Sequence, residues 1–226
     1  QQEKYFLNSC VFAMTSISEG LPMVLLESMQ YGVPCIAYKT ESGVSDIIEN
    51  GKNGYVILNR NEEEYVEKLI EEVKGLAAII EDTNKEIETL YIGGGTPTAL
   101  EPKEMDTLIT ALFKELDLTK IKEFTVEAGR PDSITREKLE VLKKHNVSRI
   151  SINPQTMNDE TLEKIGRAHS VSDIVDCFNM AREIGFDNIN MDLILGLVDE
   201  DLEMVRNTLE EIKKLSPESL TVHTLA

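Results

Sequence analysis

Short apolar runs alternate with longer amphipathic stretches along the whole chain, and this pattern limits the possible folds more than any other feature. Runs typical of strands lie at 11–15, 34–38, 54–58, 88–92, 123–127, 148–152, 188–194 and 219–223. Patterns typical of helices lie at 22–31, 43–49, 61–81, 103–116, 134–145, 158–165, 171–185 and 199–215. Most of the strands are apolar on both faces, as strands covered by helices are. The alternation predicts an α/β fold of parallel strands with alternating helices.

Polar residues ahead of three helix patterns indicate where those helices begin. Ser133 precedes the 134–145 pattern, Asn158 precedes another, and Ser170 precedes a third with Asp173 three residues later. Such side chains accept hydrogen bonds from the first free backbone N–H groups of a helix. We therefore expect Ser133, Asn158 and Ser170 to cap helices.

Composition excludes several functional classes. With 41 acidic and 23 basic residues the net charge is −18, which disfavours nucleic-acid binding. No apolar run approaches the ~18 residues that span a membrane, and the first residues lack a secretion signal. The cysteines, Cys10, Cys35 and Cys177, are far apart, which is typical of buried thiols in a reduced protein. A cytoplasmic protein is expected.

Two glutamates eight positions apart, Glu19 and Glu27, flank the beginning of the 22–31 helix. The carboxyl ends of parallel strands are where α/β sheets bind ligands, and carboxylates accept hydrogen bonds from sugar hydroxyls. The spacing alone fits a loop acid and a solvated helix acid equally well. Sugar binding therefore needs support from the surrounding motif.

That motif runs SISEGLPMVLLESMQYGVPCIAYKTESGVSDIIENGKNGYVI. It resembles the nucleotide-sugar half of retaining GT-B glycosyltransferases. The resemblance implies a partial Rossmann-like unit over residues 1–69, in which Glu19 contacts the donor sugar and Glu27 the nucleotide ribose. The acceptor domain of that family has no counterpart in the chain, so the resemblance implies binding and not catalysis.

A second set of motifs begins with the glycine-rich stretch GGGTPT at 93–98, which follows a predicted strand. Glycines let the backbone approach a ligand closely. Polar residues then follow the later strands in turn, namely Glu127, Gln155, Arg167 and Asp192, with Ala226 after the last strand. In a barrel of βα units such residues converge at one end, so we expect a ligand site there.

The stretches GGGTPT, EAGRPD, RISINPQTM, IGRAHS, NMDLILGL and LTVHTLA occur in this order. They resemble radical S-adenosylmethionine (SAM) enzymes of the oxygen-independent coproporphyrinogen III oxidase group, also called coproporphyrinogen dehydrogenases. The resemblance implies a partial radical SAM (β/α) barrel over 70–226. It implies that Gly94, Gly95 and Thr96 bind the aminocarboxylate of SAM, that Glu127, Gln155, Arg167 and Asp192 contact its polar and ribose atoms, and that Ala226 lines the adenine pocket.

The chemistry that this resemblance implies is cleavage of SAM to a 5′-deoxyadenosyl radical, followed by oxidative decarboxylation of a porphyrinogen propionate. That family holds a [4Fe–4S] cluster on a C-x3-C-x2-C loop upstream of GGGTPT. The chain has no such loop there, and three close thiolates are needed for the cluster. No catalytic or metal-ligating residue is therefore predicted, and the chain is expected to be inactive alone.

Other polar residues near the predicted site are expected to be structural. Arg130 and Asp132 are predicted to pair locally or to cap the next helix. His169 is predicted to be a satisfied surface histidine.

The sequence thus predicts two parts joined somewhere in 60–75: a glycosyltransferase-like unit at 1–69 and a truncated radical SAM half-barrel at 70–226. A natural fusion, an assembly artefact and a designed recombination all fit. Three functions remain open: a radical SAM relative that binds SAM, a nucleotide-sugar-binding fragment, and a non-catalytic α/β scaffold. In the first two the partner is a small molecule.

Overall fold

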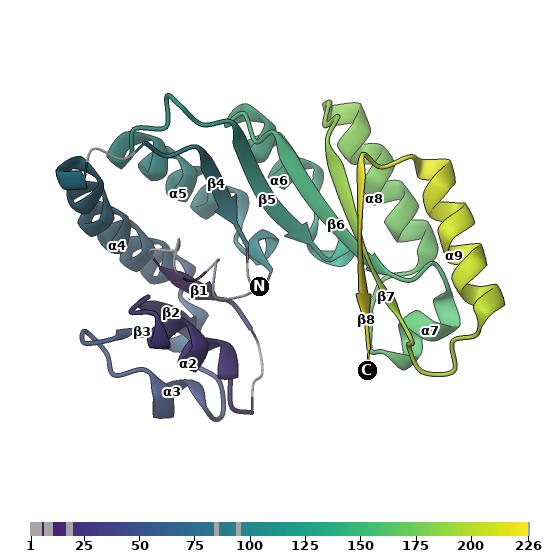
Figure 1. Ribbon diagram of the computed structural model, residues 1–226, viewed down its shortest axis with the longest axis horizontal. Helices are drawn as coiled ribbons and strands as arrows, with labels where there is room; N and C mark the ends of the chain where they lie inside the picture. Colours follow the sequence, from purple (N-terminus) through teal and green to yellow (C-terminus); the bar gives the residue numbers. More distant parts are fainter. Residues whose placement is uncertain (1–5, 7–10, 17–19, 84–85, 94–95, 226) are drawn as a thin grey trace. The chain divides into compact units, whose positions relative to one another are not determined.

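The computed structural model describes residues 6, 11–16, 20–83, 86–93 and 96–225. Strands and helices alternate along the chain, and all the strand pairs recorded among these residues are parallel. Two compact units result, Gln1–Thr89 with Gly93–Lys122, and Leu90–Ile92 with Glu123–Ala226 (Figure 1). The predicted α/β fold of parallel strands is confirmed.

The first unit contains a three-stranded sheet in the order β1-β2-β3. Its strands are β1 (Phe12–Met14), β2 (Cys35–Tyr38) and β3 (Gly54–Ile57). Its helices are α2 (Met23–Gln30), α3 (Val44–Ile47), α4 (Glu62–Thr83) and α5 (Pro102–Glu115), with short 3-10 turns η1 (Leu58–Arg60) and η2 (Pro97–Ala99). The long helix α4 packs against both the sheet and α5.

Strand β2 is buried along its whole length, and apolar groups cover both of its faces. Cys35 and Ala37 belong to one core cluster with Leu25 of α2. On the other face, the ring of Tyr38 stacks on Tyr65 of α4 with ring centroids 4.6 Å apart. This arrangement explains why the strand is apolar at every position.

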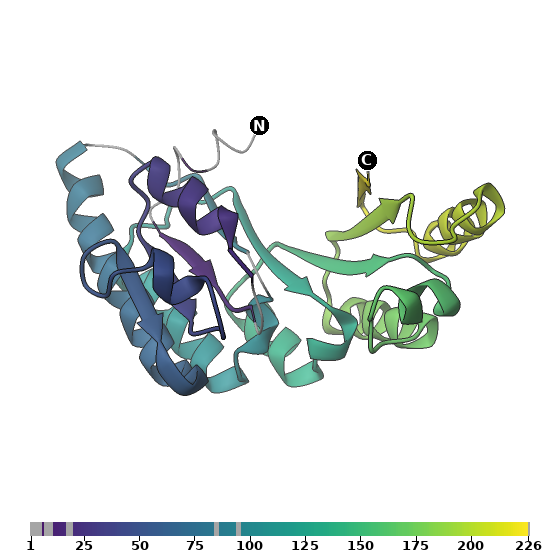
Figure 2. The same ribbon diagram turned by 90° about the horizontal axis from the view of Figure 1, so that it is seen from below.

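The second unit contains a five-stranded sheet in the order β4-β5-β6-β7-β8. The strands are β4 (Thr89–Ile92), β5 (Glu123–Gly129), β6 (Arg149–Gln155), β7 (Ile189–Leu195) and β8 (Ser219–Thr224). The connections contain η3 (Pro131–Ser133), α6 (Arg136–Lys144), α7 (Asp159–Lys164), α8 (Val171–Ile184) and α9 (Leu202–Leu215). Figures 1 and 2 show α6 and α8 on the same side of β5 and β6.

The two faces of this larger sheet differ in polarity. Val126, Ile150 and Met191 are fully buried on one face, which matches the buried apolar faces of α6 and α8. Successive side chains of a strand point to opposite sides, so the intervening residues Glu127, Ser151 and Asn190 share the other face. That second face carries the polar residues.

Two of the three predicted helix caps are confirmed. The side chain of Asn158 accepts from Thr161 N, and Ser170 forms a reciprocal capping box with Asp173. The cap predicted at Ser133 is wrong, because α6 begins later and Thr135 accepts from Lys138 N. Ser133 belongs to η3, where its hydroxyl donates to the carbonyl of Arg130.

Most of the 60–75 stretch in which the join is predicted lies in α4, which is one continuous helix from Glu62 to Thr83. The boundary between 1–69 and 70–226 concerns the origin of the two segments and stays a prediction. Among the described residues, no helix is long and apolar enough to cross a membrane.

Candidate functional site

The register of the large sheet brings polar side chains from four strands together in rows. Glu127 of β5 pairs with Ser151 of β6, which pairs with Asn190 of β7, which in turn pairs with Ser219 of β8. The next pair on the same face, two residues further along each strand, is Asp192 of β7 with Thr221 of β8. Two of the predicted SAM residues, Glu127 and Asp192, therefore lie on the same polar face.

Asn190 lies at the centre of a hydrogen-bond network on this face. Its Nδ2 donates to Ser151 Oγ at 2.9 Å and to Asp192 Oδ1 at 2.5 Å. Its Oδ1 accepts from the hydroxyls of Ser219 and Thr221 at 2.9 and 3.2 Å. The amide thus uses two donors and two lone pairs, which is its full capacity. This satisfied network explains how Asn190 can be only 3% exposed.

The carboxylate of Asp192 is held at one oxygen. Asn190 donates to Oδ1, and Ser151 Oγ lies 3.5 Å from the same atom. No hydrogen bond to Oδ2 is recorded among the described residues, and the residue is partly exposed. Asp192 can therefore offer Oδ2 to a hydroxyl or amino group of a ligand.

Strands β5 and β6 are irregular at the points where two predicted site residues lie. The pairing of β5 with β6 shifts between Glu127 and Gly129, and that of β6 with β7 shifts between Ile152 and Gln155. Pro154 has no N–H to give to the ladder, so a bulge is expected there. Gln155 then adopts φ of +70°, a conformation that costs energy outside glycine and is common at functional sites.

Arg167 lies in a different cluster from Asp192, in the loop between α7 and α8. Partial burial and the neighbouring charge of Arg130 lower the pKa of its guanidinium, while Asp132 opposes the shift. Arg130 Nε lies 3.6 Å from Asp132 Oδ1, so the predicted local pairing of these two is confirmed. A desolvated guanidinium beside a second one favours an anionic ligand.

His169, predicted to lie at the surface, has a fully buried side chain, so that prediction is wrong. Its Nδ1 lies 3.3 Å from Asp132 Oδ1. Sequence reasoning also missed Asn190. The spacing Asn-x-Asp could have indicated it, because residues two apart on a strand share a face.

Part of the predicted SAM site lies outside the described residues, namely Gly94, Gly95 and Ala226. Thr96 is described, and its backbone N donates to Thr15 Oγ1 at 3.0 Å. Of the predicted nucleotide-sugar residues, Glu19 also lies outside the described residues, whereas Glu27 is a partly buried residue of α2. Neither sugar contact is tested by this arrangement.

The described cysteines do not fit an iron–sulfur cluster. Cys35 lies in β2 and Cys177 in α8, and both thiols are free and buried. Burial raises the pKa of both, that of Cys177 to about 12, whereas cluster ligands are thiolates. No group of three or more histidine, cysteine or acidic residues able to hold a metal occurs in the described part of the chain.

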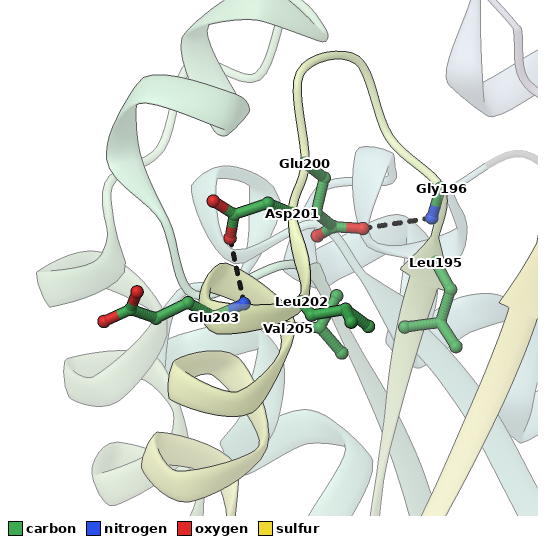
Figure 3. A pocket seen from close by; sticks show the side chains of 7 residues that line it. All are labelled: Leu195, Gly196, Glu200, Asp201, Leu202, Glu203 and Val205. Carbon is green, nitrogen blue, oxygen red and sulfur yellow. Dashed lines mark hydrogen bonds between the residues drawn. The ribbon is translucent and has the colours of Figure 1, made fainter.

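An open hollow lies beyond the end of β7, at the beginning of α9 (Figure 3). It is lined by Leu195, Gly196, Glu200, Asp201, Leu202, Glu203 and Val205. Glu200 Oε2 accepts from Gly196 N at 3.0 Å, and Asp201 Oδ1 caps α9. These two acids are already used by the backbone, so the hollow offers mainly apolar contacts.

Comparisons with known proteins agree with the fold and with the second set of motifs, which begins at GGGTPT. The model of the Radical SAM superfamily matches residues 35–212. The chain is 47% identical over 156 residues to the oxygen-independent coproporphyrinogen-III oxidase-like protein HemZ of Bacillus subtilis, covering 69% of this chain and 31% of that protein. It is 36% identical over 174 residues to the heme chaperone HemW of the same organism, covering 76% and 45%. The chain thus spans less than half the length of these relatives.

Among solved structures, the coproporphyrinogen III oxidase HemN of Escherichia coli, a radical SAM enzyme, is similar with a TM-score of 0.64 and 26% identity. The match covers 76% of this chain and 39% of that one. These findings support the radical SAM part of the sequence prediction and give no support to the glycosyltransferase part. The family model covers well over half of the sequence, and the chain therefore belongs to the Radical SAM superfamily.

Proposed function

We propose that the chain binds S-adenosylmethionine on the polar face of β5 to β8. The observation that carries the proposal is the network in which Asn190 holds Asp192 by one carboxylate oxygen and leaves the other for a ligand. Glu127 and Asp192 would accept hydrogen bonds from ribose hydroxyls or the amino group. Arg167 would meet the carboxylate, and Gly94, Gly95, Thr96, Gln155 and Ala226 would complete the contacts.

In this family, SAM bound at a reduced cluster supplies a 5′-deoxyadenosyl radical. The buried, protonated thiols of Cys35 and Cys177 do not fit that cluster, so we assign no radical step to the chain. We propose that it binds SAM and is inactive by itself. Anaerobic reconstitution with iron and sulfide tests this part, and a stable brown cluster with stoichiometric iron would contradict it.

Isothermal titration with SAM tests the binding proposal. We expect a 1:1 complex, and Asp192→Asn should weaken it by roughly ten-fold, the loss typical of a hydrogen bond to a charged group. Glu210→Gln on the exposed side of α9 is the matched control and should bind as the parent does. A folded parent chain that releases no heat with SAM would contradict the proposal.

Nucleotide-sugar binding by residues 1–69 is tested by the same titration with a uridine-diphosphate sugar. The support for a glycosyltransferase-like unit at 1–69, joined to the radical SAM half-barrel at 70–226, is the motif string around Glu19 and Glu27. Heat that disappears in Glu27→Gln would favour nucleotide-sugar binding. If the folded chain releases no heat with either ligand, the non-catalytic α/β scaffold is the function that remains.

We further propose that the ligand class beyond SAM is a tetrapyrrole. The support is that the matched relatives are named as a heme chaperone and as a coproporphyrinogen III oxidase, two activities on tetrapyrroles. Titration with hemin, followed by its absorbance, should show saturable binding at one site. Binding no stronger than that of an unrelated acidic protein would contradict it.

A further inference from the structure

One buried side chain joins the segment that follows β5 to the loop between α7 and α8. His169 lies just before α8, and its ring is fully buried. Its Nδ1 lies 3.3 Å from Oδ1 of Asp132, which belongs to η3 after β5. Residues of η3 also contact residues of α8. The pair therefore connects the segment that follows β5 with the segment that follows α7.

Each of these segments carries an arginine. Arg130 directly precedes η3, and its Nε shares Oδ1 of Asp132 at 3.6 Å. Arg167 stands two residues before His169 in the same loop, and its backbone N donates to the carbonyl of Leu162 at the end of α7 at 2.9 Å. Asp132 is thus the carboxylate shared by His169 and Arg130.

The hydrogen bonds of this cluster are incomplete. His169 Nε2 and Arg130 Nε are buried without a hydrogen-bond partner among the described residues. Because the carboxylate of Asp132 can only accept, Nδ1 of His169 is the donor in this pair. The Asp132–His169 bond thus selects one tautomer and one ring orientation, as acid–histidine pairs do in many sites.

We propose that Asp132 and His169 are positioning residues that hold Arg167 in place for the carboxylate of its ligand. The inference rests on the proposed SAM binding. The pair acts by fixing the two loops relative to each other, so that the guanidinium of Arg167 is already placed before the ligand arrives. Neither residue needs to touch the ligand.

Two variants separate positioning from simple packing. In His169→Asn the amide Nδ2 takes the place of the ring Nδ1 and keeps the donor to Asp132, although the side chain is smaller. In His169→Leu the volume is kept and the donor is lost. We expect His169→Leu to weaken SAM binding by roughly ten-fold and His169→Asn to stay within about three-fold of the parent. A role in packing alone predicts the opposite order.

Nuclear magnetic resonance supplies a readout that does not depend on SAM. The chain has three histidines, so His145→Gln and His223→Gln variants identify the signals of His169. We expect the Nδ1-protonated tautomer in the parent chain and its loss in Asp132→Ala. The side-chain Nε–H signal of Arg167 should shift in His169→Leu and stay in place in His169→Asn, while His145→Leu serves as the control.

The outcomes separate the two proposals. If the folded parent chain binds no SAM, the proposed function fails, and the Arg167 signal alone decides whether the pair positions it. If SAM binds equally well to His169→Leu, or if the Arg167 signal is the same in all variants, the positioning role is overturned. Thermal melting of each variant shows that the comparison is made between folded chains.

Discussion

The two sheets of the chain are both built from parallel strands and yet differ in what their faces can do. Strand β2 of the first unit is buried at every position and is apolar towards the helices on both sides. Strands β6 and β7 of the second unit bury Ile150 and Met191 on one face, and on the other they carry hydrogen-bonded Ser151 and Asn190.

The difference separates two ways of burying a strand. In β2 the burial is hydrophobic, and the ring of Tyr38 packs on that of Tyr65. In β6 and β7 the polar face is buried because its groups satisfy one another, which leaves Asp192 Oδ2 available. The second arrangement is the one suited to ligand binding, and the predictions below test how distinct the two arrangements are.

The largest expected effect is that of a charge placed inside β2. Ala37→Asp puts a carboxylate at a fully buried position without a donor, and we expect it to destabilise the first unit by about 4 kcal/mol or more. The matched change Asn153→Asp, at a partly exposed position of β6, should cost about 1 kcal/mol or less. Urea unfolding of both variants checks the difference.

Tyrosine fluorescence makes that measurement specific to one unit. Five of the six tyrosines lie within Gln1–Thr89, namely Tyr5, Tyr31, Tyr38, Tyr55 and Tyr65. Amide hydrogen exchange in β6 and β7 reports on the other unit. Similar unfolding midpoints for the two aspartate variants would show that the faces are not different in the way proposed.

A smaller loss is expected when the hub of the polar face is removed. Asn190→Leu leaves Asp192, Ser219 and Thr221 without their shared partner, and we expect a cost of about 2–3 kcal/mol. Ser151→Ala removes one member and should cost about 1 kcal/mol. Hydrogen exchange of β7 and β8 measures both. If Asn190→Leu leaves the free energy of unfolding unchanged, the polar face is not held by this network.

In the first unit, removing a polar atom should increase stability. The hydroxyl of Tyr65 is buried without a hydrogen-bond partner among the described residues, so Tyr65→Phe should stabilise the unit by about 1 kcal/mol. Tyr55→Phe, at a partly exposed position, is the control and should change stability by less than about 0.5 kcal/mol. Destabilisation by Tyr65→Phe would indicate a partner for the hydroxyl.

The same tyrosine pair predicts a loss of stability at high pH. Burial raises the pKa of Tyr38 to about 12 and raises that of Tyr65 as well. Below about pH 10, the ordinary pKa of a tyrosine in an unfolded chain, both tyrosines are protonated in the folded and in the unfolded chain. In that range the free energy of unfolding keeps its full value. Between about pH 10 and 12 the unfolded chain ionises first, so stability falls as pH rises. Unfolding curves of Tyr38→Phe across this range should show a shallower fall than those of the parent.

The smallest effect distinguishes the true cap of α6 from the predicted one. Thr135→Ala removes the bond to Lys138 N and should cost about 1 kcal/mol. Ser133→Ala, in η3, should cost less than about 0.5 kcal/mol. Thermal unfolding compares the two, and a larger effect at Ser133 would restore the sequence-based assignment.

Most of the secondary structure could be predicted from the sequence because hydrophobic period and length separate strands from helices clearly here. β2, for example, is apolar at every position, and Ser170 with Asp173 marks the beginning of α8. The candidate site was predictable only in part. Asp192 follows from its place on a strand, but the hub role of Asn190 depends on the register of three strands, which no single stretch contains.

Two further features, the burial of His169 and the backbone of Gln155, could not be predicted from the sequence for similar physical reasons. The burial of His169 depends on η3 packing against α8, which brings together residues 37 positions apart. The left-handed backbone of Gln155 depends on a bulge at Pro154 in a paired strand. The alternation of strands and helices in the sequence gives no information about the burial of His169 or about the backbone of Gln155.

The complete bonding of Asn190 also affects how tightly a ligand can be held. An amide with every donor and acceptor in use cannot change its rotamer without breaking several bonds at once, so it keeps Asp192 in one orientation. The conformational entropy of that carboxylate is therefore lost when the sheet folds and is not lost again at each binding event. A preorganised acceptor of this kind lets a small polar ligand bind with more of its interaction energy appearing as affinity.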